Sequence, residues 1–263
     1  MSQSRRALRH LSQHIRPLGS TAARSTTRSI YHSKMVGSNL FKSERLIYRA
    51  IEDSDEDLDF IHSISLDAEG FANGMDLALV PQNKEATKRW KQRLETAIIA
   101  VIVCLPPPSG PEPAADTCAE DAAPAQQPGK KAASSTPIGL ISLSGPTSMR
   151  TAQHRNANVG IDILPPYQRR GYGSEAIRWV VGWGFEAYGL HRIGIESFSH
   201  NEGAGRLYER LGFVPEQRKR EALWFRGGWS DLLGFAMLED EWRERQRQRQ
   251  RRELGQEQAA RIA

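Results

Sequence analysis

The chain has 263 residues, 39% of them hydrophobic, which is enough to bury one sizeable core or two small ones, and no apolar run approaches the length of a membrane span. Its formal net charge of +5 is unevenly placed, because residues 1–43 carry +8, residues 243–263 carry +4 and the body between them carries −7. An acidic body argues against specific nucleic-acid binding and suits a cationic substrate, and the two cysteines and scattered histidines have neither disulfide nor metal-ligand spacing.

Residues 1–42 are predicted to form a basic, disordered extension. They are rich in Arg, Ser and Thr and contain no acidic residue. Four apolar residues recur at helical spacing: Leu8, Leu11, Ile15 and Leu18. This is the composition of a mitochondrial transit peptide and favours the mitochondrial matrix. The alternatives are a plain disordered tail, or translation that starts at Met35 and leaves the protein in the cytoplasm.

The first half of the body reads as strand, helix, helix and strand. Glu44–Ile51 (ERLIYRAI) alternates as a strand does. Ser54 followed by three acidic residues predicts a capped helix N-terminus, because a helix dipole favours acids in its first turn. Asp67–Gln82 reads as irregular, Asn83 as the cap of a second helix, and Ile98–Leu105 as a strand.

Composition changes sharply at Pro106–Pro137, which is rich in Pro, Ala and Ser. It contains too few large apolar residues to offset the entropy of ordering. A strand-like pattern resumes at Ile138. We therefore predict a β-hairpin with an expanded loop, an insertion within one domain of residues 43–242, because closure entropy grows slowly with loop length.

From Asn156 onward strands and helices alternate. The predicted strands are Asn158–Leu164 and His191–Ser199, and the predicted helices are Ser174–Tyr188 and Glu202–Leu211, capped after their ends by Gly189 and Gly212. A closing hairpin is predicted from Ala222–Arg226 and Leu232–Leu238 around Gly227-Gly228. Residues 243–263 form a charged tail, predicted to be a solvated, fraying helix.

The stretch YQRRGYGSEA, Tyr167–Ala176, lies between a predicted strand and a predicted helix. Unpaired N–H groups and the positive end of the helix dipole attract phosphate there, glycines allow close approach, and arginines add charge. The glycine spacing matches neither a dinucleotide fingerprint nor a P-loop. Taken alone, the stretch is a candidate phosphate site or an ordinary tight turn with solvated arginines.

Several stretches together resemble the GNAT superfamily of acyl-CoA N-acyltransferases. Gln-x-x-Gly-x-Gly at Gln168–Gly173 is similar to its motif A. The opening strand and helix cap of that superfamily resemble ERLIYRAIEDSD. Its later strand–helix block is similar to HRIGIESFSHNEGAGRLYERLGF. The closing hairpin of the branch that includes bacterial ribosomal-protein N-terminal acetyltransferases is similar to GGWSDLLGFAMLEDEW. The resemblance covers residues 43–242 apart from the insertion. It implies an α/β fold with a mixed, twisted sheet, flanking helices and splayed central strands that hold acetyl-CoA.

The resemblance also implies which residues hold acetyl-CoA, the expected co-substrate; no metal is expected. Main-chain amides of the motif would hold the pyrophosphate, with one or both arginines on the phosphates. Main-chain groups near the end of the preceding strand would pair with the pantetheine arm, which an asparagine side chain also reaches. The predicted cofactor residues are Ile163, Leu164, Gln168, Arg169, Arg170, Gly171, Tyr172, Gly173 and Asn201.

Two further positions match catalytic residues of the related N-terminal acetyltransferases. Glu196, five residues before Asn201, would act as general base, and Tyr208, seven residues after it, as general acid. Core packing on a helical face also explains Tyr208. Glu196 can equally face solvent or pair with Arg206, and Asp162 on the neighbouring strand is a second candidate base. His200 is expected at the surface.

We therefore expect an N-acetyltransferase that acts on a primary amine: a protein N-terminus, a lysine or a small amine such as a polyamine. By analogy with the fold, Asp67–Gln82 and Trp224–Asp231 would line the acceptor site, where acidic and aromatic residues suit a cation with an apolar part. The alternatives are a GNAT-fold module that binds CoA without catalysis, or a protein that contacts nucleic acid through its basic tails. The acceptor and the oligomeric state are left open by the sequence.

Overall fold

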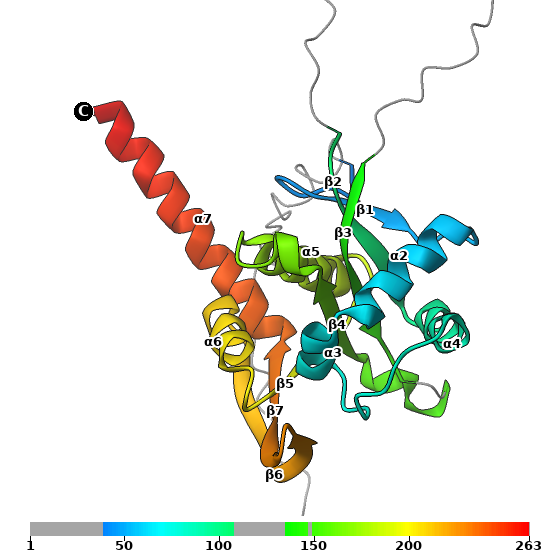
Figure 1. Ribbon diagram of the computed structural model, residues 1–263. Helices are drawn as coiled ribbons and strands as arrows, with labels where there is room; N and C mark the ends of the chain where they lie inside the picture. The colour runs from blue at the N-terminus through cyan, green and yellow to red at the C-terminus, as the bar shows by residue number, and fades with distance from the viewer. Residues whose placement is uncertain (1–38, 108–134, 147–148, 263) are drawn as a thin grey trace, which may run out of the picture. The chain divides into compact units, whose positions relative to one another are not determined.

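The computed structural model describes residues 39–107, 135–146 and 149–262 (Figure 1). Phe41–Ala263 forms one compact unit. The first half of its elements comprises β1 (Ile47–Ala50), α2 (Asp55–Leu66), α3 (Ala68–Gly74), α4 (Lys84–Glu95), β2 (Ile99–Leu105), β3 (Thr136–Ser144) and the 3-10 helix η1 (Met149–His154). The second half comprises β4 (Asn156–Ile163), η2 (Pro165–Tyr167), α5 (Tyr172–Glu186), β5 (Arg192–Phe198), α6 (Glu202–Leu211), β6 (Val214–Phe225), β7 (Gly228–Leu238) and α7 (Glu239–Ile262).

Within the described residues seven strands form one mixed sheet in the order β1-β2-β3-β4-β5-β7-β6. Every neighbouring pair is antiparallel except β4 and β5, which are parallel. Figure 1 shows α2, α3 and α4 on one side of this sheet and α5 on the other. The predicted α/β class with a mixed sheet and flanking helices is confirmed.

The central strands β4 and β5 part after a short shared stretch. They pair only from Asn156↔Arg192 to Val159↔Ile195. Beyond that point β4 stays bonded to β3 as far as Ile163, and β5 stays bonded to β7 as far as Phe198. The inner edges of the two strands are therefore unpaired with each other, which is the splay that the family resemblance implied.

Two apolar clusters hold the helices to the sheet. The larger one joins the apolar stripe of α5 to the strands, and it includes Ile177, Val180, Val181 and Phe185. The smaller one joins α2 and α4 to the opposite face through Ile61, Ile64, Leu94 and Leu140. Both faces of the central strands are thus covered, as a partly parallel sheet requires.

The predicted helix caps of the first half are present. Ser54 Oγ accepts from the Asp57 N–H over 3.2 Å, and Asn83 Oδ1 accepts from the Ala86 N–H over 2.8 Å. The prediction that Asp67–Gln82 is irregular was wrong, because it contains α3. A seven-residue segment with two glycines has weak helix propensity, and burial of Phe71 and Ala72 against the rest of the domain overrides it.

Both predicted hairpins exist, with differences in extent. β2 and β3 pair from Ile99↔Leu143 to Leu105↔Thr136, and the insertion between them lies largely outside the described residues. The closing hairpin is longer than predicted, because β6 begins at Val214. That edge strand is mostly exposed and highly charged, so it shows no apolar alternation from which a strand could be predicted.

The C-terminal helix begins four residues before the predicted tail. Trp242 is buried, and its ring centre lies 5.6 Å from that of Phe185 on α5, so packing anchors the first turn of α7. Gly212 follows α6 with a φ of 105°, as its predicted role as a cap requires. Gly189 also has a positive φ, of 77°, but α5 is capped two residues earlier, at Ala187. The proposed transit peptide lies outside the described residues.

Candidate functional site

The loop between β4 and α5 presents a row of backbone N–H groups. Arg169 and Gly171 both have positive φ, 59° and 84°. Among the described residues, no hydrogen bond uses the backbone N–H of any residue from 169 to 174. These groups lie at the N-terminus of a fifteen-residue helix, where the dipole is positive. The arrangement suits a phosphate anion.

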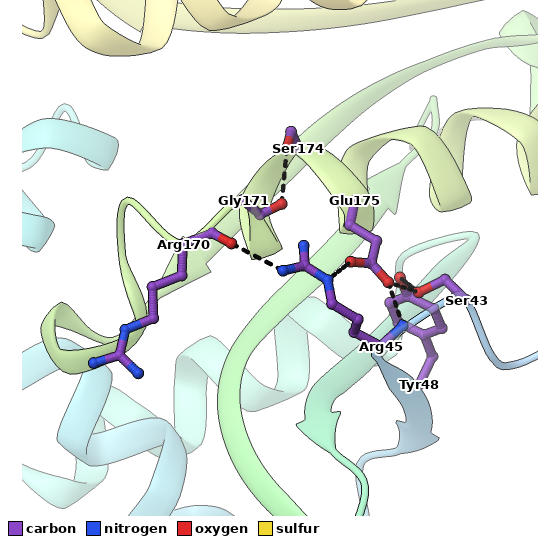
Figure 2. A network of polar contacts seen from close by, with 7 residues as sticks. All are labelled: Ser43, Arg45, Tyr48, Arg170, Gly171, Ser174 and Glu175. Carbon is purple, nitrogen blue, oxygen red and sulfur yellow. Dashed lines mark hydrogen bonds and ion pairs between the residues drawn. The ribbon is translucent and has the colours of Figure 1, made fainter.

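A polar network connects this loop and the start of α5 to the segment before β1 (Figure 2). Glu175, in the first turn of α5, accepts from Ser43 Oγ and from the backbone and side chain of Arg45. Arg45 Nη1 also donates to the Arg170 carbonyl over 3.1 Å. Ser174 Oγ donates to the Gly171 carbonyl over 2.7 Å. The loop is therefore bonded to the segment that leads into β1.

The two residues predicted to pair with the pantetheine arm, Ile163 and Leu164, differ in where their backbone groups point. Leu164 donates its N–H to the Ile138 carbonyl over 2.9 Å and accepts from the Tyr167 N–H over 2.9 Å, so both its backbone groups are engaged within the chain. By strand alternation the backbone groups of Ile161 and Ile163 point the other way, into the gap between β4 and β5. The Ile163 carbonyl accepts from Gln168 Nε2 over 2.8 Å. Ile161, which sequence reasoning missed, lies at the open edge instead of Leu164.

Asp162 lies on β4 where the strand has left β5. The residue is partly exposed, and α3 packs beside it: a Cβ added at Gly74 would lie 3.5 Å from Asp162 Oδ1. Burial of the carboxyl group, with the nearby negative charge of Asp67, raises the pKa of Asp162 to about 6. A carboxylate with this pKa is deprotonated at neutral pH and still accepts a proton readily.

Tyr208 reaches the same region from α6 on the other face. It is 7% exposed and packs edge-on against Phe235, with ring centres 5.7 Å apart. Burial, with the negative charge of Asp162, raises the pKa of Tyr208 to about 12. The phenol is therefore protonated at neutral pH, and it lies close enough to Asp162 for that residue's charge to raise its pKa.

Glu196 stands across the gap from Asp162, on the same face of the sheet. The register Asn158↔Gly194 fixes this, because alternate residues of each strand share a face. Glu196 is exposed. Its suggested partner Arg206 instead bonds Glu202 over 2.8 Å. Asp162 and Glu196, the two candidate bases, therefore lie on the same face of the sheet, and their positions alone do not distinguish between them.

His200, expected at the surface, is partly exposed, and its ring is fixed by contacts with two elements. It is partly buried and stacked on Phe225, with ring centres 4.0 Å apart. Its Nε2 lies 3.2 Å from the Ala72 carbonyl, and its Nδ1 lies 2.8 Å from Ser230 Oγ. Because a carbonyl only accepts, Nε2 carries the proton in the neutral ring and Nδ1 accepts from Ser230. His200 therefore links α3 to the closing hairpin.

Asn201, the predicted pantetheine contact, is used by the fold. Its Oδ1 accepts from the Ala204 N–H over 3.3 Å and caps α6. Its Nδ2 lies 3.4 Å from the Asn73 carbonyl of α3, a long contact that a ligand can replace. The assignment of Asn201 to the cofactor stays a prediction.

The two predicted acceptor segments line one cavity of about 410 Å³. Its lining comes from Met75–Leu79 after α3 and from Ala222–Arg226 of the hairpin, and it also includes Phe198 and His200. The lining is largely apolar, with Asp76 and Arg226 as its charged residues. A second cavity of about 350 Å³ adjoins it between the α3–α4 connection and α4.

Comparison with known families identifies the fold. Residues 45–214 match the family model of the acetyltransferase (GNAT) domain. The chain belongs to this family. Among the helices of the described residues, none is long and apolar enough to cross a membrane. The same residues contain no group of three or more His, Cys, Asp or Glu side chains placed to hold a metal ion.

Curated GNAT relatives share parts of the sequence. An uncharacterised N-acetyltransferase of Bacillus subtilis is 41% identical over 75 residues, 28% of this chain and 42% of the relative. A second B. subtilis protein, provisionally named a ribosomal N-acetyltransferase, is 30% identical over 104 residues, 40% of this chain and 55% of the relative. A spermidine N(1)-acetyltransferase of Vibrio cholerae is 29% identical over 92 residues, 35% of this chain and 53% of the relative. The chain spans about half the length of the curated relatives that it matches.

Solved GNAT structures share the fold. The spermidine N-acetyltransferase of V. cholerae, solved with CoA and spermine, has a TM-score of 0.56 at 22% identity, over 76% of this chain and 99% of that one. A GNAT acetyltransferase from Bacillus anthracis has a TM-score of 0.55 at 19% identity, over 76% of this chain and 98% of that one. At these identities the likeness establishes the fold alone.

Proposed function

We propose that the protein is an acetyl-CoA-dependent N-acetyltransferase that acts on a primary amine. The observation that carries this proposal is the parting of β4 and β5 after Val159↔Ile195, with Asp162 on the freed end of β4 and Tyr208 on α6 near enough that the charge of Asp162 raises the pKa of Tyr208. Membership of the GNAT family supports the same activity. Each residue of the proposed site has a separate task.

The described residues include groups suited to bind two parts of acetyl-CoA, its pyrophosphate and its pantetheine arm. The N–H groups of residues 169–174 and the positive end of α5 suit a pyrophosphate, and Arg169 and Arg170 are exposed beside them. The open backbone edge of β4 at Ile161 and Ile163 suits the amide groups of the pantetheine arm, which can pair with it as an added strand does.

The two titratable groups suit the two proton transfers. Acetyl-CoA supplies a thioester, whose carbonyl carbon forms a bond to the amine nitrogen as its bond to sulfur breaks. An ammonium group has no free electron pair, so Asp162 accepts its proton, directly or through water. Tyr208 gives its phenolic proton to the departing thiolate, and the second proton that the nitrogen loses as it becomes an amide restores the phenol, directly or through water. The raised pKa values, about 6 and about 12, put each group in the protonation state that its task requires at neutral pH.

Acidic groups and a largely apolar cavity suit a cationic acceptor. Asp67 lies near enough to raise the pKa of Asp162, so two carboxyl groups act on the same region. The cavity between Met75–Leu79 and Ala222–Arg226 would receive the carbon chain of the acceptor. Two relatives named for ribosomal and for spermidine acetylation favour a protein N-terminus and a polyamine as the first acceptors to test, with lysine as a third.

An acceptor panel tests the proposal. The full chain is incubated with acetyl-CoA and spermidine, a lysine-containing peptide blocked at its N-terminus, or peptides with free N-termini, and free CoA thiol is followed. We expect thiol release that depends on one amine class, with the acetylated amine identified by mass spectrometry.

A matched pair of measurements separates the alternatives. CoA binding without thiol release on every amine would favour a binding module without catalysis. Absence of CoA binding would contradict the proposal itself.

A further inference from the structure

Arg45 joins three separate parts of the molecule (Figure 2). Its Nε and its backbone N–H donate to the two carboxylate oxygens of Glu175, over 2.8 and 2.7 Å. Its Nη1 donates to the Arg170 carbonyl over 3.1 Å. Its guanidinium carbon lies 4.8 Å from the centre of the Tyr172 ring. One side chain therefore connects the segment before β1 with α5 and with the loop that precedes α5.

Glu175 is itself held in place. Ser43 Oγ donates to Glu175 Oε1 over 2.7 Å, and since this uses its only proton, Ser43 Oγ accepts from the Tyr48 hydroxyl over 2.8 Å. Burial acts to raise the pKa of Glu175, but the hydrogen bonds from Ser43 and Arg45, with the charge of Arg45, outweigh it and hold that pKa below its usual value. The carboxylate is thus charged at neutral pH. Without Arg45 it would repel an anion at the start of α5.

The bond to the Arg170 carbonyl fixes one peptide plane of the loop. In a planar trans peptide the C=O and the following N–H point in opposite directions. Because the Arg170 carbonyl points toward Arg45, the Gly171 N–H points away from Arg45, and like the neighbouring N–H groups it has no partner in the described residues. Gly171, with a φ of 84°, would let this peptide turn easily if the bond were lost.

We propose that Arg45 is a positioning residue that keeps the Gly171 N–H turned toward the pyrophosphate of acetyl-CoA. The inference rests on the proposed function, because the pyrophosphate site belongs to it. Lysine at this position would keep the charge but not the fork that bonds Glu175 and Arg170 at once. Arg45→Lys therefore separates positioning from charge alone.

Calorimetric titration of CoA into the full chain tests the inference. We expect Arg45→Lys and Glu175→Ala each to raise the Kd for CoA about tenfold or more, the effect of losing one hydrogen bond to a charged group. The double variant should bind within about twofold of Arg45→Lys, because both changes break the same link. The control is Arg243→Met, which removes an exposed arginine bonded to Glu239 on α7 and should leave the Kd unchanged.

A donor without pyrophosphate provides the second readout. With S-acetylpantetheine, kcat/KM should be the same for Arg45→Lys as for the wild type, which also shows that the variant is folded. An unchanged Kd for CoA in Arg45→Lys would overturn the inference, and so would an equal loss with both donors. A wild type that binds no CoA would overturn the proposed function as well, so the two failures are distinguishable.

Discussion

Tyr208 is a core side chain to which we assign the role of general acid. Its ring is buried against Phe235 and Phe213, and its hydroxyl senses Asp162. Tyr208→Phe keeps the packing and removes the proton. We expect turnover to fall at least about tenfold while the Kd for CoA stays within a factor of about two. Steady-state kinetics beside calorimetry check this, and unchanged turnover would withdraw the assignment of Tyr208 as acid.

Substitutions at Asp162 and at Glu196 distinguish the two candidate bases. If Asp162 is the base, Asp162→Asn should lower kcat/KM about a hundredfold and remove the rising limb of its pH profile, which has its midpoint near pH 6 in the wild type. Glu196→Gln, a matched loss of charge at an exposed position on the same face, should change kcat/KM less than about fivefold. The reverse pattern would return the role of base to Glu196.

The raised pKa of Asp162 also predicts a pH-dependent change in the stability of the fold. Its folded pKa, about 6, lies above its ordinary value of 3.8, so the ionised carboxylate destabilises the fold. This penalty is absent below about pH 4, grows as the pH rises toward 6 and is complete above it. Asparagine is neutral throughout, so Asp162→Asn should be more stable than the wild type at neutral pH by about 1–3 kcal/mol, with less advantage at about pH 4. Urea unfolding at both pH values checks this, and an advantage that does not change with pH would contradict it.

The family resemblance predicted Tyr208, Glu196 and the loop as site residues, but not the groups that surround them. The bonds from Arg45 to Glu175 join positions 130 residues apart, so no local pattern reveals them. The bonds of His200 were not predicted because the carbonyl that it contacts belongs to α3, an element that the sequence did not reveal. Leu164 was misjudged because its bonding depends on β3 and η2. Strand alternation would have favoured Ile161 and Ile163.

At the scale of elements, α3 is held beside the gap by residues that precede α6. His200 bonds the Ala72 carbonyl, and Asn201 contacts the Asn73 carbonyl. His200→Ala should loosen α3 and raise the KM for the acceptor about fivefold or more, the value of one lost hydrogen bond, without changing the Kd for CoA. His191→Ala, at an exposed position on the connection to β5, is the matched control. A rise in the Kd for CoA instead would place His200 in the donor site.

Elements with strong local signals were predictable, and those that depend on tertiary contacts were not. Capping residues, apolar alternation and glycine ends located α2, α4, α6 and the central strands. The short α3 is stabilised by contacts with β4 and β5, which are distant in sequence, and the charged edge strand β6 by pairing with β7; no pattern within either segment reports these contacts.

At the scale of the whole molecule, the splay of β4 and β5 followed from the family resemblance and not from periodicity. Nothing in the residues of either strand states that pairing ends at Val159↔Ile195; beyond that point β4 stays bonded to β3 and β5 to β7, which hold the two strands apart. The division into an extension, a GNAT domain and a tail stays a prediction, as does mitochondrial import. The acidic balance of residues 44–242 is in keeping with a cationic acceptor.

If the gap and its loop form the acetyl-CoA site, a crystal structure of the protein grown with CoA should show the ligand there. We expect pyrophosphate density on the N–H groups of residues 169–174, the pantetheine arm along the open edge of β4, and the thiol sulfur beyond Val159 and Ile195, beside Tyr208. CoA bound elsewhere, for example in the groove of about 800 Å³ lined by α5, α6 and α7, or an empty gap at saturating CoA, would show that the acetyl-CoA site is not here.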